Sequence, residues 1–138
     1  MKFTIVFTIF VLLFMSCNKN QTAVKKLDGT WIATNYEVTK NNLTSDYLDI
    51  GMKFKYQFDN CKLKENEYCQ ISIITSNDFG TETNVDIYRV VNNGNGLEVV
   101  DPIDNSIQYY SILKLNSNKL KLEKNENGIR TEITLKHN

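Results

Sequence analysis

Residues 50–59 read Ile-Gly-Met-Lys-Phe-Lys-Tyr-Gln-Phe-Asp, an alternation of apolar residues with polar residues or glycine. Residues 129–136 alternate in the same way. A period of two places the apolar side chains on one face of a strand and the polar side chains on the other. Because this period, and not one of 3.6, runs through nearly all of the chain after residue 26, the sequence predicts an all-β fold.

Turn-forming residues separate the alternating segments, as in Asn92-Asn93-Gly94-Asn95-Gly96 and Asn125-Glu126-Asn127-Gly128. A sheet with one apolar face has to curl or stack to bury that face, and closure also removes its exposed edges. The expected architecture is an antiparallel up-and-down meander, closed into a small barrel of about eight strands. The expected strands are 30–39, 50–59, 68–76, 82–91, 96–100, 107–115, 118–124 and 129–136.

The first residues have the layout of an export signal. Lys2 precedes an apolar run from Phe3 to Phe14, and the small residue Ser16 leads into Cys17. This run of about a dozen residues is shorter than the roughly 20 that a membrane-spanning helix needs, and it lacks the polar face of a core helix. The segment resembles the signal of a bacterial lipoprotein, in which the cysteine becomes the lipidated first residue. We expect a signal peptide over residues 1–16, a lipidated tether over 17–26 and a barrel domain over 27–138.

Composition limits the classes of function. The chain has 138 residues, enough for one domain with one core, and its formal net charge is zero. Its lysines alternate with acidic residues, as in Lys121-Leu122-Glu123-Lys124. A nucleic-acid-binding protein would show a basic patch or stripe. We therefore expect solvated strand faces and no nucleic-acid partner.

Three cysteines are present, an odd number for an exported protein. If Cys17 carries lipid, Cys61 and Cys69 remain as a pair, and disulfides persist outside the cytosol. A metal site is the alternative, but two cysteines without a nearby histidine do not complete a tetrahedral zinc shell. The sequence therefore predicts a disulfide between Cys61 and Cys69, with no metal and no cofactor.

Catalytic groups are sparse in this sequence. The only histidine is His137, beside the C-terminal residue, where we expect a frayed and solvated end. The usual pairs of a nucleophile and a base are therefore missing. Carboxylate pairs such as Asp101 and Asp104 lie in turn segments, where aspartate is favoured for its local backbone hydrogen bonds. We do not expect an enzyme.

Leu27-Asp28-Gly29-Thr30-Trp31 opens the first expected strand. With the strand count and the final strands, this Gly-x-Trp resembles the lipocalins, and more closely the short lipocalin-like lipoproteins of Bacteroidetes-type bacteria. The resemblance implies that Trp31 closes one end of the barrel under a cation from the last strand. In an up-and-down barrel of eight strands the last strand ends where the first begins. Lys136 is therefore the expected cation, in a cation–π contact of about 0.5–1 kcal/mol.

The resemblance also implies an envelope lipoprotein that binds a small hydrophobic or amphiphilic ligand inside its barrel. Its expected location is the outer membrane, on the periplasmic or the external side, with the membrane as partner through Cys17. An interior of eight strands either holds one small ligand or is filled by side chains. A filled barrel would instead serve as an interaction module: an inhibitor, an immunity protein or a subunit of an envelope complex. The expected lining residues are Phe54, Tyr56, Phe58, Tyr109 and Leu113.

Overall fold

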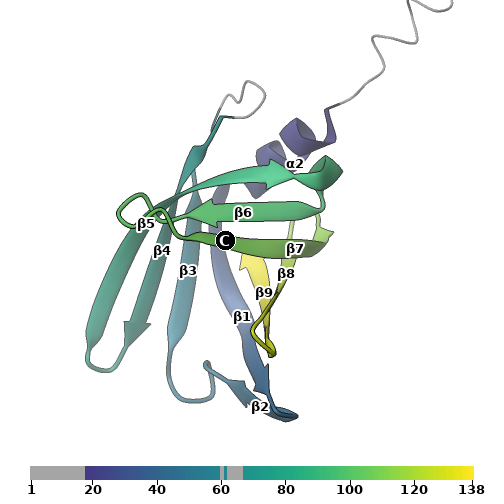
Figure 1. Cartoon of the computed structure of the whole chain (residues 1–138). Helices are drawn as coiled ribbons and strands as arrows, with labels where there is room; N and C mark the ends of the chain where they lie inside the picture. The colour runs from purple at the N-terminus through teal and green to yellow at the C-terminus, as the bar shows by residue number, and fades with distance from the viewer. Residues whose placement is uncertain (1–17, 60, 62–66) are drawn as a thin grey trace, which may run out of the picture.

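A computed structural model describes residues 18–59, 61 and 67–138. The expected signal peptide and Cys17 lie outside these described residues. The chain forms one helix, one short 3-10 turn and a series of strands (Figure 1). In chain order they are α2 (Lys19–Leu27), β1 (Gly29–Lys40), β2 (Leu43–Asp46), β3 (Lys53–Phe58), β4 (Cys69–Asn77), β5 (Gly80–Val91), η1 (Asn92–Gly94), β6 (Gly96–Val100), β7 (Ile107–Leu115), β8 (Lys119–Glu126) and β9 (Ile129–His137).

The strands form a closed antiparallel barrel, which confirms the predicted fold class. Strands β3 to β9 pair in sequence order, and β1 pairs with both β3 and β9 to close the ring. One further strand, β2, lies outside the ring and was not predicted. It is a hairpin partner of the second half of β1, with Glu37 opposite Asp46 and Lys40 opposite Leu43. Its sequence Leu-Thr-Ser-Asp carries no apolar alternation, because no side of it belongs to the core.

The strand predicted over residues 50–59 is shorter in the structure, where β3 spans Lys53–Phe58. Residues 47–51 form turns in which the Gly51 amide donates to the Leu48 oxygen and the Met52 amide to the Tyr47 oxygen. Gly51 has a φ of +86°, which side-chain-bearing residues rarely adopt. The alternating pattern therefore continues past the point at which the backbone leaves the sheet.

Most of the segment expected as the tether, residues 17–26, is helical, although no helix was predicted there. Asn18 caps α2, its side-chain oxygen accepting from the amides of Asn20 and Gln21. The helix buries Ala23, Val24 and Leu27 and lies across one end of the barrel (Figure 1). A helix of nine residues with three apolar side chains is too short to give a clear periodic signal. It is stabilised by its cap and by packing on the barrel.

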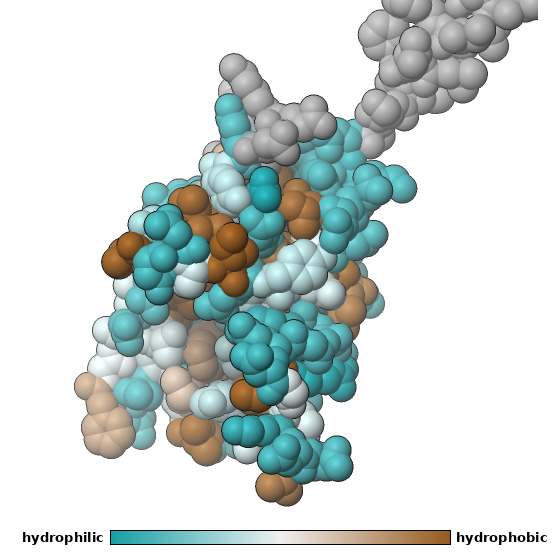
Figure 2. Space-filling model, in the orientation of Figure 1, coloured by the Kyte–Doolittle hydropathy of each residue, from teal (hydrophilic) through white to brown (hydrophobic). Residues whose placement is uncertain are grey.

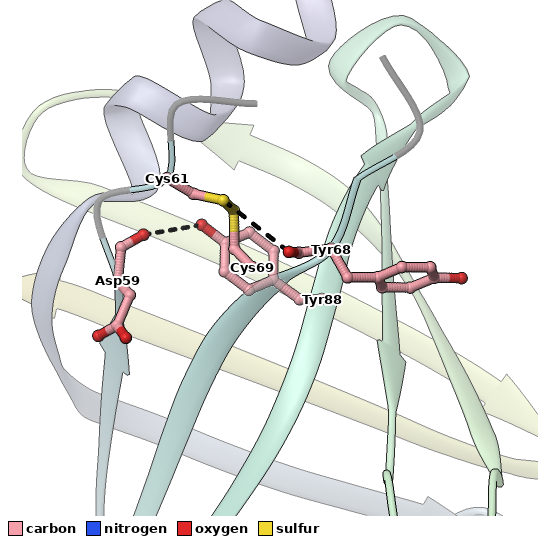
Figure 3. The surroundings of a disulfide bond; sticks show 5 residues. All are labelled: Asp59, Cys61, Tyr68, Cys69 and Tyr88. Atoms are coloured by element: carbon pink, nitrogen blue, oxygen red, sulfur yellow. Dashed lines mark hydrogen bonds between the residues drawn. A yellow bond between two sulfur atoms is a disulfide. The ribbon is translucent and has the colours of Figure 1, made fainter. Parts of the chain in front are cut away.

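The predicted disulfide between Cys61 and Cys69 is confirmed. Figure 3 shows it beside Tyr88, whose hydroxyl points to the backbone oxygen of Asp59, 3.5 Å away. The Tyr88 ring is fully buried and packs edge-on against Phe58, with 5.1 Å between ring centroids. The disulfide thus fixes the start of β4 beside the helix-covered part of the core.

Candidate ligand-binding site

One end of the barrel is closed by α2, Trp31 and the last strand. Trp31 is fully buried, and its indole N–H donates to the backbone oxygen of Leu27 over 2.7 Å. The ring of His137 meets the Trp31 ring edge-on, with 4.7 Å between centroids and 85° between planes. Leu27 is itself fully buried. We call the opposite end of the barrel, where β3 and β5 begin and β4 and β6 end, the mouth.

The closed half of the interior is apolar and tightly packed. Inward side chains near α2 are almost fully buried, among them Phe58, Ile71, Leu97, Leu120 and Leu135. Nearer the mouth, the inward side chains of Tyr36, Ile73 and Tyr110 are only partly buried. In Figure 2, hydrophobic side chains are visible among the hydrophilic ones on this side of the molecule. Burial of these inward side chains therefore decreases from the α2 end towards the mouth.

An aromatic cluster lines the side of the mouth formed by β1 and β3. Tyr36 stacks on Phe54 with 4.4 Å between ring centroids, and Tyr47 packs edge-on against Tyr36 at 5.5 Å. Tyr56, buried on β3, lies close to Tyr36 on the same wall. Burial is the main reason that the pKa of Tyr56 lies well above its ordinary value, with the neighbouring tyrosines adding to the effect. Both hydroxyls are therefore neutral hydrogen-bonding groups in an otherwise apolar wall.

Three polar side chains, those of Gln108, Tyr110 and Lys124, face this cluster from β7 and β8. The Tyr110 hydroxyl donates to Gln108 Oε1 over 2.8 Å, and Lys124 Nζ donates to the same oxygen over 3.3 Å. Lys124 also lies 3.3 Å from a carboxylate oxygen of Glu126 and 5.7 Å from the centre of the Tyr110 ring. Burial and then the charges of Tyr36, Asp86 and Glu126 raise the pKa of Tyr110. These side chains offer hydrogen bonds and one positive charge to the polar end of a bound molecule.

Asp86 belongs to the same region, on β5. Its pKa lies above the ordinary value, chiefly because burial disfavours the charged carboxylate and also because Asp101 and Asp104 are near. The barrel wall thus carries both signs of charge at the mouth, whereas the side chains near α2 are apolar. Such a wall suits a molecule with one apolar and one polar end.

Comparison of the structure with solved structures agrees with this architecture. A redesigned beta barrel matches with a TM-score of 0.53 at 13% identity, covering 84% of this chain and 95% of its own. The siderocalin Ex-FABP, described as functioning through dual ligand specificities, matches with a TM-score of 0.55 at 9% identity, covering 82% of this chain and 74% of its own.

The chain has a lipocalin-like barrel fold. At these identities the likeness establishes the fold alone. No protein-family model and no curated protein sequence matches the chain. Within the described part of this lipocalin-like chain, no helix is long and apolar enough to cross a membrane. Its described residues also contain no group of three or more histidine, cysteine or acidic side chains suited to hold a metal ion.

The expected capping cation of the lipocalin-like barrel is corrected. Lys136 lies opposite Ile32 in the β1–β9 ladder, so its side chain is on the outer face and not over Trp31. His137 lies opposite Trp31 and takes that place. Its Nε2 is also 3.2 Å from the backbone oxygen of Asp28. His137 was not predicted as a capping residue because the C-terminal end was expected to be frayed. The two-residue period of the last strand nevertheless puts His137 on the inner face with Leu135.

Gly29 explains the glycine of the Gly-x-Trp sequence. Its φ is +111°, and a Cβ at this position would lie 2.8 Å from His137 Nε2. The glycine therefore leaves room for the histidine ring that covers Trp31.

Two of the expected lining residues are also corrected. Phe54, Tyr56 and Phe58 face the interior of the lipocalin-like barrel and are buried, but Tyr109 and Leu113 lie outside and are 43% and 50% exposed. Tyr110 and Ile112 take the inner positions of β7. Apolar residues occur on both faces of β7, and its register shifts at a bulge between Ile112 and Lys114. The period of two therefore does not identify the inner face of this strand.

Proposed function

We propose that this protein is a lipid-anchored envelope protein that binds one small amphiphilic molecule inside its barrel. The observation that carries the proposal is the pairing at the mouth of an aromatic wall, which includes Tyr36 and Phe54, with the polar side chains of Gln108 and Lys124. The apolar part of the ligand lies against Phe54 and the adjoining aromatic side chains. Its polar end is met by Gln108, Tyr110 and Lys124.

The anchor is proposed from the sequence. The apolar run before Cys17 supports an exported chain with lipid on that cysteine. More than one acyl chain is required for lasting attachment, and a lipidated N-terminal cysteine meets this requirement when it is triacylated. The expected place is the bacterial outer membrane.

The binding proposal is tested with anilinonaphthalene sulfonate, an amphiphilic dye whose fluorescence rises in apolar surroundings. The full chain should bind one dye molecule, and Lys124→Met should weaken binding by about tenfold, because a hydrogen bond to a charged group is lost. Lys121→Met is the matched control, since Lys121 pairs with Glu132 on the outer face at 2.8 Å. Equal binding by both variants would contradict the proposed site.

A filled barrel that acts as an interaction module is the second candidate. It is favoured by the packing of Tyr47 against Tyr36 and Phe54, which occupies part of the mouth. Under this alternative, Tyr47→Ala would admit the dye whereas the unchanged chain would not bind it.

A further inference from the structure

Two pairs of lysines face each other on the outer surface of the barrel at the α2 end. Lys114 lies directly opposite Lys121 across β7 and β8, and Lys119 lies opposite Lys136 across β8 and β9. Like charges in directly opposed positions of an antiparallel pair are destabilising. Lys121 is paired with Glu132, but among the described residues no acidic side chain lies within ion-pair distance of the other three lysines. Their charge is left for an anion outside the chain.

The helix extends this surface. Lys19 and Lys26 of α2 line a groove of about 400 Å³ whose other wall, on β7, includes Leu113 and Lys114. Leu113 is half exposed in the groove, so an apolar side chain lies among the lysines. Basic residues around an exposed apolar side chain suit the boundary between lipid headgroups and acyl chains. We call the five residues Lys19, Lys26, Lys114, Lys119 and Lys136 the lysine surface.

The start of the described chain indicates where the lysine surface lies relative to the proposed anchor. Residue 18 caps α2, and the helix is held on the barrel by Ala23, Val24 and Leu27. The helix therefore holds Asn18, the residue that follows Cys17 in the chain, at the α2 end of the barrel. A lipid on Cys17 would bring the α2 end, and no other part of the domain, to the bilayer; this step rests on the anchor proposed above.

The opposite end carries both signs of charge. Aspartates stand in its turns, Asp49 before β3, Asp78 between β4 and β5, and Asp101 and Asp104 between β6 and β7, and Lys40 and Lys53 lie at the same end. An anionic surface would therefore attract the lysine end more strongly than this one.

We propose that the lysine surface docks on an anionic phospholipid bilayer, with the mouth of the barrel facing away from that membrane. The occupant follows from charge complementarity and from the place of Asn18, the first described residue, at the α2 end. In this orientation the binding site takes its ligand from the aqueous side or from a partner there, and not from the membrane that holds the anchor.

The test measures lysine reactivity on vesicles. The protein as purified from the cell that makes it is added to preformed vesicles of phosphatidylcholine, with or without phosphatidylglycerol, and treated with a membrane-impermeant amine-acylating reagent. Mass spectrometry then follows each lysine. Lys114, Lys119 and Lys136 should react at least about tenfold more slowly on the anionic vesicles, and high salt should abolish the difference. Lys40 and Lys53, at the mouth end, should react equally on both. Equal rates at the lysine surface, or equal protection of Lys40 and Lys53, would overturn the proposal.

Matched variants complete the test. The double variant Lys119→Gln/Lys136→Gln should lose the protection of Lys114, whereas Lys40→Gln/Lys53→Gln should keep it. Flotation with phosphatidylcholine vesicles at high salt reports the anchor alone. A chain that floats there but shows no lysine protection retains the anchor and refutes the docking surface. A chain that does not float refutes the anchor, and its lysine protection on anionic vesicles still decides the docking.

Discussion

The indole N–H of Trp31 donates to the backbone oxygen of Leu27, so the first strand and the helix that precedes it are joined inside the core. The 2.7 Å bond is buried, and both residues are inaccessible to solvent. The helix therefore belongs to the closed end of the barrel.

Trp31→Ala should lower the free energy of unfolding by about 3–5 kcal/mol, because it removes a large buried side chain. Trp31→Phe keeps most of the packing but leaves the Leu27 oxygen unpaired, at a cost of about 1–3 kcal/mol. Denaturant unfolding of both variants provides the measurement. A loss below about 1 kcal/mol for Trp31→Ala would refute the closing role of the tryptophan.

His137 and Lys136 offer a direct comparison of neighbouring residues. His137→Ala should destabilise the fold by about 0.5–1.5 kcal/mol, since it removes the edge-on contact with Trp31. Lys136→Ala, on the outer face, should change stability by less than about 0.5 kcal/mol. The reverse order in denaturant unfolding would restore the lysine as the capping group.

The disulfide should stabilise the protein by about 2.5 kcal/mol in the chain-entropy model, because it restricts the unfolded chain; the short loop between Cys61 and Cys69 keeps this gain small. Unfolding is measured with and without a reducing agent. The variant Cys61→Ala/Cys69→Ala serves as the control and should be insensitive to reduction. If the unmodified chain is equally insensitive, the bridge does not contribute to its stability.

Asp86→Asn should stabilise the fold at neutral pH. The pKa of Asp86 in the folded protein lies above the ordinary value of 3.8, so folding opposes ionisation of its carboxyl group. The contribution of Asp86 to the free energy of unfolding therefore falls as the pH rises through the folded pKa. The gain from the substitution should therefore disappear below about pH 3.8, where the aspartate is protonated in both states. Asp49→Asn, in an exposed turn, is the control for the loss of one charge. A gain that persists unchanged at low pH would contradict this explanation.

The inner face of β7 is tested with two similar residues. Ile112→Ala should cost about 2–4 kcal/mol, because Ile112 is 8% exposed and part of the core. Leu113→Ala should cost less than about 1 kcal/mol, since Leu113 is half exposed. Similar losses for the two variants in denaturant unfolding would contradict the register of this strand.

Much of the barrel could be predicted from local patterns. The alternation around Phe54 and the turn residues between strands are local consequences of one-sided burial, and they led to the eight barrel strands. The pairing of Cys61 with Cys69 followed from counting. What sequence reasoning missed depends on tertiary contacts: α2 is held by packing, and β2 by its register with β1.

The site was harder to predict than the fold. Tyr110 and Lys124 meet across neighbouring strands, and a bulge one residue long decides which face of β7 points inward. The lysine surface could not be predicted from the sequence either, because it also depends on the register of neighbouring strands. Lys119 and Lys136 alternate with other residues along their own strands and become neighbours only through the β8–β9 register.

The central claim, that the barrel holds one amphiphilic molecule, is tested most directly on protein purified gently from the cell that makes it. Native mass spectrometry of the full chain, followed by extraction with organic solvent, identifies what is bound without covalent attachment. We predict one amphiphile per chain, released by the solvent and rebound when it is offered again. A chain that carries no such molecule, even after exposure to host lipids, would contradict the claim.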